Sequence, residues 1–147
     1  MEVSAHADFS YRVLMYLALK KDTLVQVRII SEAYGISENH IMKVVQKLTK
    51  FGYVEAVRGR NGGIKLARSP EQINLGQVFR EMEPSLKLLA CFNPKTNQCP
   101  IVKSCDLTLT FKQALDAFLN VLDQKTLAQV LKKPHELRRI LDIRQSL

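Results

Sequence analysis

Residues 34–68 have the sequence YGISENHIMKVVQKLTKFGYVEAVRGRNGGIKLAR, which carries the main architectural signal of the chain. A helix is expected over residues 27–34, Gly35 breaks it, and Ser37 is a preferred N-cap for a second helix over residues 38–51. The second helix has apolar side chains at i, i+3, i+4 and i+7, the spacing of one buried stripe: Ile41, Val44, Val45 and Leu48. Two helices joined by a tight glycine turn predict a helix-turn-helix.

A β-hairpin is expected directly after this helix pair. Residues 53–58 and 64–68 fit two short strands, and between them lies the turn sequence GRNGG, residues 59–63. In a winged helix-turn-helix the second helix enters the major groove and such a hairpin, the wing, lies beside it. We therefore expect a mainly α fold with a small β-hairpin, in which residues 1–84 form a winged helix-turn-helix DNA-binding domain.

Basic residues are concentrated on this same part of the chain. The net charge is +8, and residues 43–68 hold seven basic side chains against the single acid Glu55: Lys43, Lys47, Lys50, Arg58, Arg60, Lys65 and Arg68. A basic surface alone is often only a solvated face, but one that coincides with the second helix and the wing is typical of DNA binding. We expect groove contacts from Ser37, Asn39, His40 and Lys43, and phosphate contacts from Lys43, Lys47, Arg60 and Lys65.

Two further helices are expected on either side of the helix-turn-helix and wing. The first covers residues 9–21 with Asp8 as its N-cap, and the other is capped by Asn74 and ended by Pro84.

A long helix with a sustained apolar seam is expected in the last third of the chain. Its apolar side chains recur at steps of four, four, three and four: Leu107, Phe111, Leu115, Phe118 and Leu122. This seam indicates a dimerisation helix, and the alternative is that it packs only within its own subunit. Residues 107–147 are therefore assigned to the dimerisation helix and a C-terminal tail, in which Pro134 ends a short helix over residues 126–133 and the following basic residues are solvated.

The three cysteines, Cys91, Cys99 and Cys105, all lie in a segment that we call the cysteine loop, residues 85–106. An odd number of cysteines argues against a disulfide framework in a cytoplasmic chain. Their spacings match neither a zinc ribbon nor a bacterial ferredoxin. The clustering favours a metal ion or an iron–sulfur cluster, with one position left for another residue; a structural zinc, buried thiols and thiol redox sensing are the alternatives.

Several other classes of protein are excluded by what the sequence lacks. It has no paired-carboxylate site, nucleophile motif or phosphate-binding loop, so we do not expect an enzyme. Charges interrupt every apolar stretch, and the N-terminal sequence MEVSAHADF lacks the features of a signal peptide. We expect a cytoplasmic protein with no membrane partner.

Motifs spread over about the first 123 residues resemble the IscR/NsrR family of winged-helix regulators, and within it the nitric-oxide-sensing repressors. The matching segments are residues 8–12 (DFSYR), 34–40, 52–54, 57–64 and 78–84, and the cysteine loop follows in the same place. The resemblance implies a homodimer that binds palindromic double-stranded promoter DNA, represses nitrosative-stress genes and senses nitric oxide through an iron–sulfur cluster. Sensing of iron–sulfur status or of thiol oxidation is the alternative.

The resemblance also implies a set of cluster ligands. Cys91, Cys99 and Cys105 would hold the cluster together with one further residue. Where IscR-like members have a ligating histidine this chain has Thr108. In NsrR-like members an aspartate at the start of the first helix, supplied by the other subunit, completes a [4Fe-4S] site. Asp8 matches that position, so the resemblance implies Asp8 from the partner subunit as the fourth ligand, with [2Fe-2S] as the alternative cluster.

Two features depart from the family pattern, and the resemblance also implies DNA contacts by the wing. Seven residues separate Cys91 from Cys99, where family loops have five or fewer. Met42 occupies the place of a base-reading glutamate, so a different promoter preference is expected. By the same resemblance the wing residues Arg58, Arg60 and Asn61 enter the adjacent minor groove.

Overall fold

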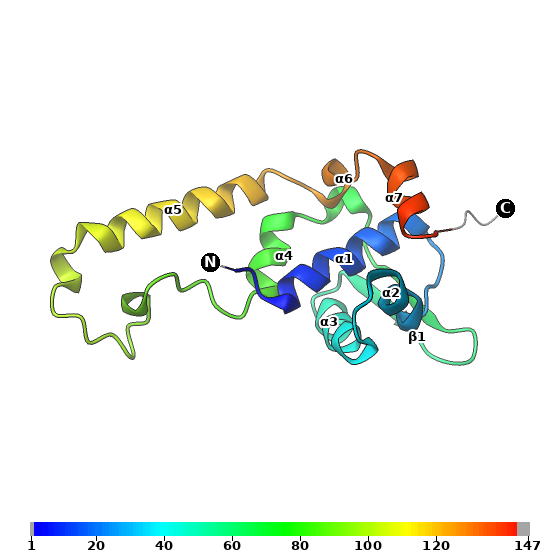
Figure 1. The fold of residues 1–147 in the computed structure, drawn as a ribbon, viewed down its shortest axis with the longest axis horizontal. Coiled ribbons are helices and arrows are strands. Elements are labelled where there is room, and N and C mark those ends of the chain that lie inside the picture. Colours follow the sequence, from blue (N-terminus) through cyan, green and yellow to red (C-terminus); the bar gives the residue numbers. More distant parts are fainter. Residues whose placement is uncertain (1, 144–147) are drawn as a thin grey trace.

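A computed structural model describes residues 2–143 of the chain (Figure 1). Its helices and strands, in order, are α1 (Ala5–Lys20), α2 (Val27–Tyr34), α3 (Glu38–Lys50), β1 (Val54–Val57), β2 (Gly63–Leu66), α4 (Leu75–Met82), α5 (Asp106–Asp123), α6 (Leu127–Val130) and α7 (Pro134–Ile140). Short 3-10 turns cover Pro70–Gln72, Ala90–Phe92 and Val102–Ser104. The expected mainly α fold with one small hairpin is confirmed.

The helix-turn-helix has the geometry that its sequence predicts. Gly35 has φ 64°, a left-handed conformation that glycine adopts without strain, and its N–H closes the end of α2 on the Glu32 carbonyl. Ser37 caps α3, since its hydroxyl accepts a hydrogen bond from the His40 N–H at 3.4 Å. The four apolar residues of the α3 stripe are all buried.

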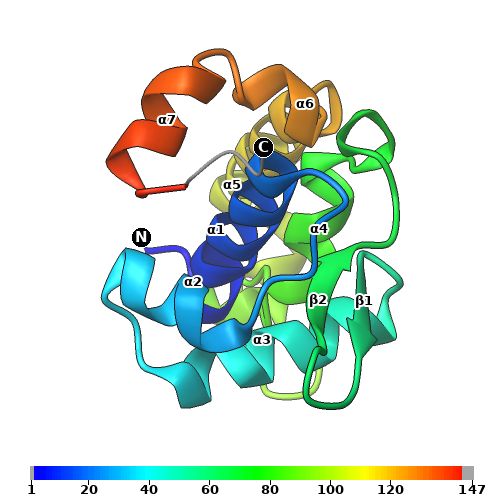
Figure 2. The same ribbon diagram turned by 90° about the vertical axis from the view of Figure 1, so that its right-hand side faces the viewer.

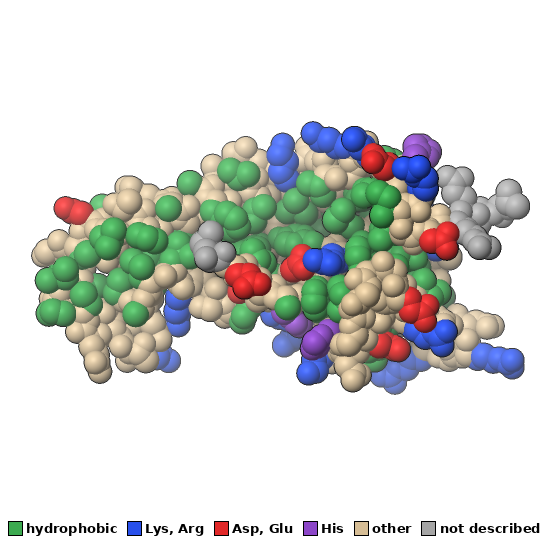
Figure 3. Space-filling view, viewed as in Figure 1, with side chains coloured by type: hydrophobic (Ala, Val, Ile, Leu, Met, Phe, Trp, Pro, Cys, Tyr) green, Lys and Arg blue, Asp and Glu red, His purple; other side chains and the backbone are tan. Residues whose placement is uncertain are grey.

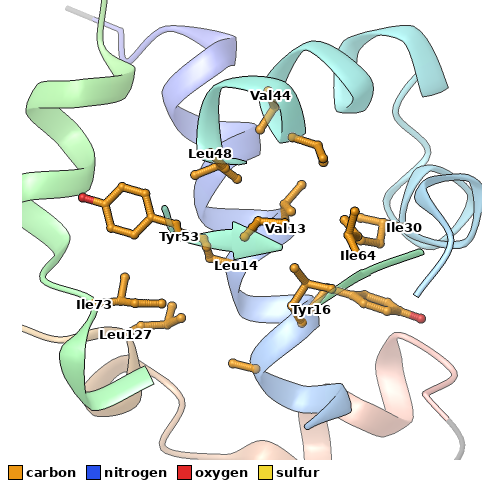
Figure 4. Close-up of a cluster of buried hydrophobic side chains, with 14 of the residues drawn as sticks. Val13, Leu14, Tyr16, Ile30, Val44, Leu48, Tyr53, Ile64, Ile73 and Leu127 are labelled. Carbon is orange, nitrogen blue, oxygen red and sulfur yellow. The ribbon is translucent and has the colours of Figure 1, made fainter. Parts of the chain in front are cut away.

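The core lies between α1, α3 and the hairpin (Figure 4). Val13 and Leu14 of α1 face Leu48 of α3, and Tyr53 and Ile64 contribute from the start of the hairpin and from β2. The hairpin is antiparallel, with Val54 opposite Leu66 and Val57 opposite Gly63, so both strands are shorter than the segments expected for them. We call α1–α4 with the hairpin the winged-helix body.

The first helix begins earlier than predicted. The N-cap of α1 is Ser4, whose hydroxyl accepts from the Ala7 N–H at 3.2 Å, so the prediction that Asp8 caps a helix starting at Phe9 is wrong. Serine is as good a cap as aspartate, and Ala5-His6-Ala7 continues a helix without interruption. Asp8 lies inside the first turn, where a negative charge is also favoured by the helix dipole.

Helix α5 projects from the body as an arm: the cysteine loop runs outward from α4 to the far end of the arm, and α5 begins there and leads back to the body (Figure 1). After α5 the chain returns to the body: Leu127 and Ile143 are buried in the same core as α1. Pro134 does not end a helix as predicted but begins α7, since proline at the first helical position loses no hydrogen bond. The tail is not simply solvated either, because the Arg138 Nε donates to the Leu19 carbonyl at 3.0 Å; Arg144 lies outside the described residues.

Candidate DNA interface and cysteine site

Helix α3 and the tip of the wing lie at the same end of the molecule, opposite α6 and α7 (Figure 2). Lys and Arg side chains gather along this lower edge (Figure 3). The residues expected in the groove are all exposed on the first turns of α3: Ser37, Asn39, His40 and Lys43. Met42 on the same helix is also exposed. The structure therefore brings these residues to one surface, and their contacts with bases remain a prediction.

The wing presents Arg58, Arg60 and Asn61 to solvent at its turn. A tight backbone turn holds them there: the Gly62 N–H donates to the Gly59 carbonyl at 3.0 Å, and Gly59 has φ 110°. The side chains of Arg58, Arg60 and Asn61 are therefore exposed on the same side as α3, and their contacts with the minor groove remain a prediction.

Two other basic residues of this surface have partners within the protein. The Lys65 ammonium lies 3.6 Å from the Glu55 carboxylate across the hairpin. Lys47 is half-buried, and its ammonium donates to the Met82 carbonyl at 3.3 Å. The structure thus gives Lys47 a position beside α4 that its placement in the basic segment did not predict.

Arg68 supports α3, which we call the reading helix, rather than extending its charged face. Its guanidinium donates to the Phe51 carbonyl at 2.7 Å and to the Gly52 carbonyl at 2.9 Å, at the end of α3. It also stacks over the Tyr53 ring, 4.6 Å from the centroid, and the Tyr53 hydroxyl donates to Glu81 of α4. Sequence reasoning counted Arg68 only as one more positive charge, because its partners are set by the tertiary fold.

Two of the three cysteines converge on Thr108 in the first turns of α5. The Cys91 Sγ lies 3.4 Å from the Thr108 hydroxyl oxygen, and Thr108 is buried. The same hydroxyl, followed by the backbone amides of Thr108 and Leu107, stabilises the Cys105 thiolate and lowers the pKa of Cys105 below its usual value. Thr108 is therefore the residue on which these two thiols converge.

Cys99 and Asp8 lie apart from this pair. Cys99 is exposed, and its backbone N–H donates to the Asn97 side chain at 2.9 Å. The Asp8 carboxylate pairs with Arg12 instead, with Oδ2 and the guanidinium 2.7 Å apart. Within residues 2–143 of this single chain, no group of three His, Cys, Asp or Glu side chains is close enough to hold a metal ion.

Asp8 lines an apolar groove between the winged-helix body and the arm. The groove has a volume of about 600 Å³, and its lining includes Phe9, Tyr11, Phe79 and Phe118. The α5 surface continues this apolar character, as the band of hydrophobic side chains along the arm shows (Figure 3). Its exposed apolar residues include Leu107, Leu109, Phe111, Phe118 and Val121. An exposed apolar face of this length is typical of a surface that another protein chain covers.

Comparison with known proteins identifies the family. Residues 3–133 match the model of the Rrf2 family, described as an iron-dependent transcriptional regulator. The chain belongs to the Rrf2 family. The HTH-type transcriptional regulator NsrR of Bacillus licheniformis is 44% identical over 142 residues, which are 96% of this chain and 99% of that protein. NsrR of Bacillus subtilis is 39% identical over 146 residues, 99% of this chain and 100% of that protein.

A solved structure of a similar protein has the same fold as this chain. The structure of T. potens IscR superposes with a TM-score of 0.73 at 28% identity, covering 94% of this chain and 91% of that one. The resemblance predicted from the motifs is confirmed, as is the prediction that the protein is a transcriptional regulator and not an enzyme. Among residues 2–143, no helix is both long and apolar enough to cross a membrane.

Proposed function

We propose that this Rrf2 regulator is a homodimeric cytoplasmic repressor that senses nitric oxide through an iron–sulfur cluster and controls nitrosative-stress genes. The observation that carries this proposal is the convergence of Cys91 and Cys105 on Thr108 in the first turn of α5, where the Thr108 hydroxyl lowers the pKa of Cys105. Thiolates are the preferred ligands of iron in such clusters, and a lowered pKa favours the ligating form.

The donor set of the chain fits such a cluster when a second subunit is included. Cys91, Cys99 and Cys105 would supply three thiolates, and Asp8 of the partner subunit would supply the fourth ligand of a [4Fe-4S] cluster, with [2Fe-2S] as the alternative. When bound, the cluster supplies iron with which nitric oxide reacts. In the single chain this carboxylate pairs with Arg12, 2.7 Å from Oδ2.

The dimer surface and the Asp8 groove support a ligand shared between subunits. Asp8 lines a groove that is also lined by Phe118 of α5, and α5 is the helix with the exposed apolar face. A second copy packed on that face would therefore lie next to Asp8. Release of the Asp8 carboxylate would loosen α1 against the partner subunit and change the spacing of the two α3 helices, which bind successive major grooves of a palindrome.

The test is an anaerobic absorption spectrum with an iron count, followed by a nitric-oxide titration in the presence of a duplex selected by the protein from a random-sequence pool. We expect a brown protein with about four irons per chain, bleached by nitric oxide as the duplex is released. Cys99→Ala protein should lose the colour, whereas the matched control Ser104→Ala should keep it. If the protein is colourless or contains zinc and still binds the duplex, it remains a winged-helix regulator, but sensing of nitric oxide through an iron–sulfur cluster is wrong.

The exposed thiol of Cys99 favours a second candidate, the sensing of thiol oxidation by the metal-free protein. In that case peroxide would change the affinity of metal-free protein for the selected duplex, and Cys99→Ala would abolish the response. An unchanged affinity after peroxide treatment would exclude this candidate.

A further inference from the structure

Lys47 lies at the junction of three elements that belong to different parts of the proposed mechanism. It is in the last turn of α3, and its ammonium donates to the carbonyl of Met82, the last residue of α4. The last carbonyls of a helix have no partner within the helix, and a cation there is also favoured by the helix dipole. Lys47 therefore stabilises the end of α4 as well as joining it to the reading helix.

The next residue along the chain, Glu83, makes a second connection from the same point. Its carboxylate accepts a hydrogen bond from the Ser4 N–H at 3.0 Å, and Ser4 is the N-cap of α1, the helix that carries Asp8. His6 shares this polar cluster: burial and the Lys47 charge lower its pKa, and the Glu83 charge opposes them. Met82 and Glu83 thus connect the end of α4 to both α3 and the start of α1.

This junction is also the root of the cysteine loop, which begins two residues after Glu83 at residue 85. A displacement of the loop at its root would move the Met82 carbonyl and, through Lys47, the last turn of α3. Lys43, one turn earlier on the same helix, is exposed, so it provides a matched basic residue at the DNA surface.

We propose that Lys47 is a positioning residue that ties the reading helix to the root of the cysteine loop, so that the state of the loop sets the orientation of α3 on DNA. This assignment replaces its expected role as a phosphate contact. It rests on the proposed function only in that the cluster is what changes the state of the loop.

The first test compares DNA binding by the full-length parent with Lys47→Met, Lys47→Arg and Lys43→Met proteins. Each is titrated with the selected duplex over a series of salt concentrations, in the iron-loaded and the metal-free form. Coupling between sites in proteins is typically about 5- to 150-fold. We expect Lys47→Met to reduce the ratio of iron-loaded to metal-free affinity by about 5-fold or more with an unchanged salt slope, and Lys47→Arg, which keeps a donor, to restore most of the ratio.

Lys43→Met should show the opposite pattern, because loss of a phosphate contact lowers the salt slope by about 0.9. Its affinity ratio should stay at the parent value. If Lys47→Met lowers the salt slope in this way, or leaves the affinity ratio unchanged, Lys47 is not a positioning residue.

The second test needs neither iron nor DNA. Hydrogen exchange of the metal-free protein should be faster at residues 81–83 and in the last turn of α3 in Lys47→Met, but unchanged there in Lys43→Met. Unchanged exchange in Lys47→Met would overturn the connection itself. If the parent protein holds no iron and exchange is nevertheless faster in Lys47→Met, the connection through Lys47 stands. The proposed sensing of nitric oxide through a cluster is then rejected.

Discussion

The apolar side chains of α3 and α5 have opposite environments. In the winged-helix body Ile41 and Leu48 are fully buried by other parts of the same chain. On the arm, Leu107, Leu109 and Val121 are 59%, 56% and 62% exposed. Both helices carry an apolar stripe in the sequence, but the stripe of α5 is covered only in part within the subunit: Phe118 packs against Phe79 and Leu122 against the core, whereas Leu107 stays exposed. The difference is what supports the proposal that a second chain covers the arm.

The largest expected effect comes from truncating one apolar side chain in each region. Leu48→Ala leaves a cavity in the body and should lower the free energy of unfolding by about 2–5 kcal/mol. Val121→Ala removes an exposed side chain and should change it by about 0.5 kcal/mol or less when the monomer prevails. Urea denaturation at low protein concentration measures both. Equal losses in the two variants would remove the distinction between body and arm.

The joint between the two regions gives the next prediction. Gly76 of α4 packs against α5, where a Cβ would collide with the Asp123 carboxylate and lie 2.9 Å from the Asp123 backbone nitrogen. Gly76→Ala should therefore destabilise the protein by about 1–3 kcal/mol, measured by thermal unfolding. The exposed neighbour Gln77 provides the control, and Gln77→Ala should have a much smaller effect. A neutral Gly76→Ala would show that α5 can move away from α4 at little cost.

A smaller effect is expected at the start of α1. Because Ser4 is the N-cap, Ser4→Ala should lower the free energy of unfolding by about 1 kcal/mol. Asp8→Ala removes a half-exposed ion pair with Arg12 and should cost about 0.2–1 kcal/mol in the metal-free protein. A greater loss for Asp8→Ala than for Ser4→Ala would contradict the capping geometry.

The smallest effect concerns pH and again the joint of body and arm. Arg80 donates two hydrogen bonds to Asp123, at 2.6 and 2.7 Å, which lower the pKa of Asp123 below its ordinary value of 3.8. A lowered folded-state pKa stabilises the protein above pH 3.8, and this contribution is lost as the pH falls through the folded-state pKa. Between pH 5 and pH 3 the parent should therefore lose slightly more stability than Arg80→Gln, measured as the shift in melting temperature. Identical acid profiles would show that the pair contributes nothing to the joint.

The helix-turn-helix was predictable because its signals are local. Gly35, Ser37 and Asn74 act where the sequence placed them, and the period of α3 alone identified its buried face. The start of α1 was misassigned because Ser4 and Asp8 are both good caps, and only packing decides between them.

Side-chain partners across the fold could not be predicted from local signals. Lys47 and Arg68 are basic residues of the kind that DNA-binding surfaces carry, yet each donates to backbone carbonyls at a helix end. The contact of Thr108 with Cys91 likewise depends on how the cysteine loop returns to α5. The sequence could name the cysteines of the site but not the residue that brings two of them together.

The central claim is that a second subunit completes the cysteine site with its Asp8. It is tested most directly by mixing Asp8→Ala chains with Cys99→Ala chains and measuring the visible circular dichroism of iron-loaded mixed dimers. If Asp8 acts across the dimer, each mixed dimer has one site with all three cysteines and an Asp8 from the other chain. The signal should then reach about half that of the parent and exceed the mean of the two variant homodimers. A signal equal to that mean would contradict the claim, because a ligand from the same chain leaves both sites of the mixed dimer incomplete.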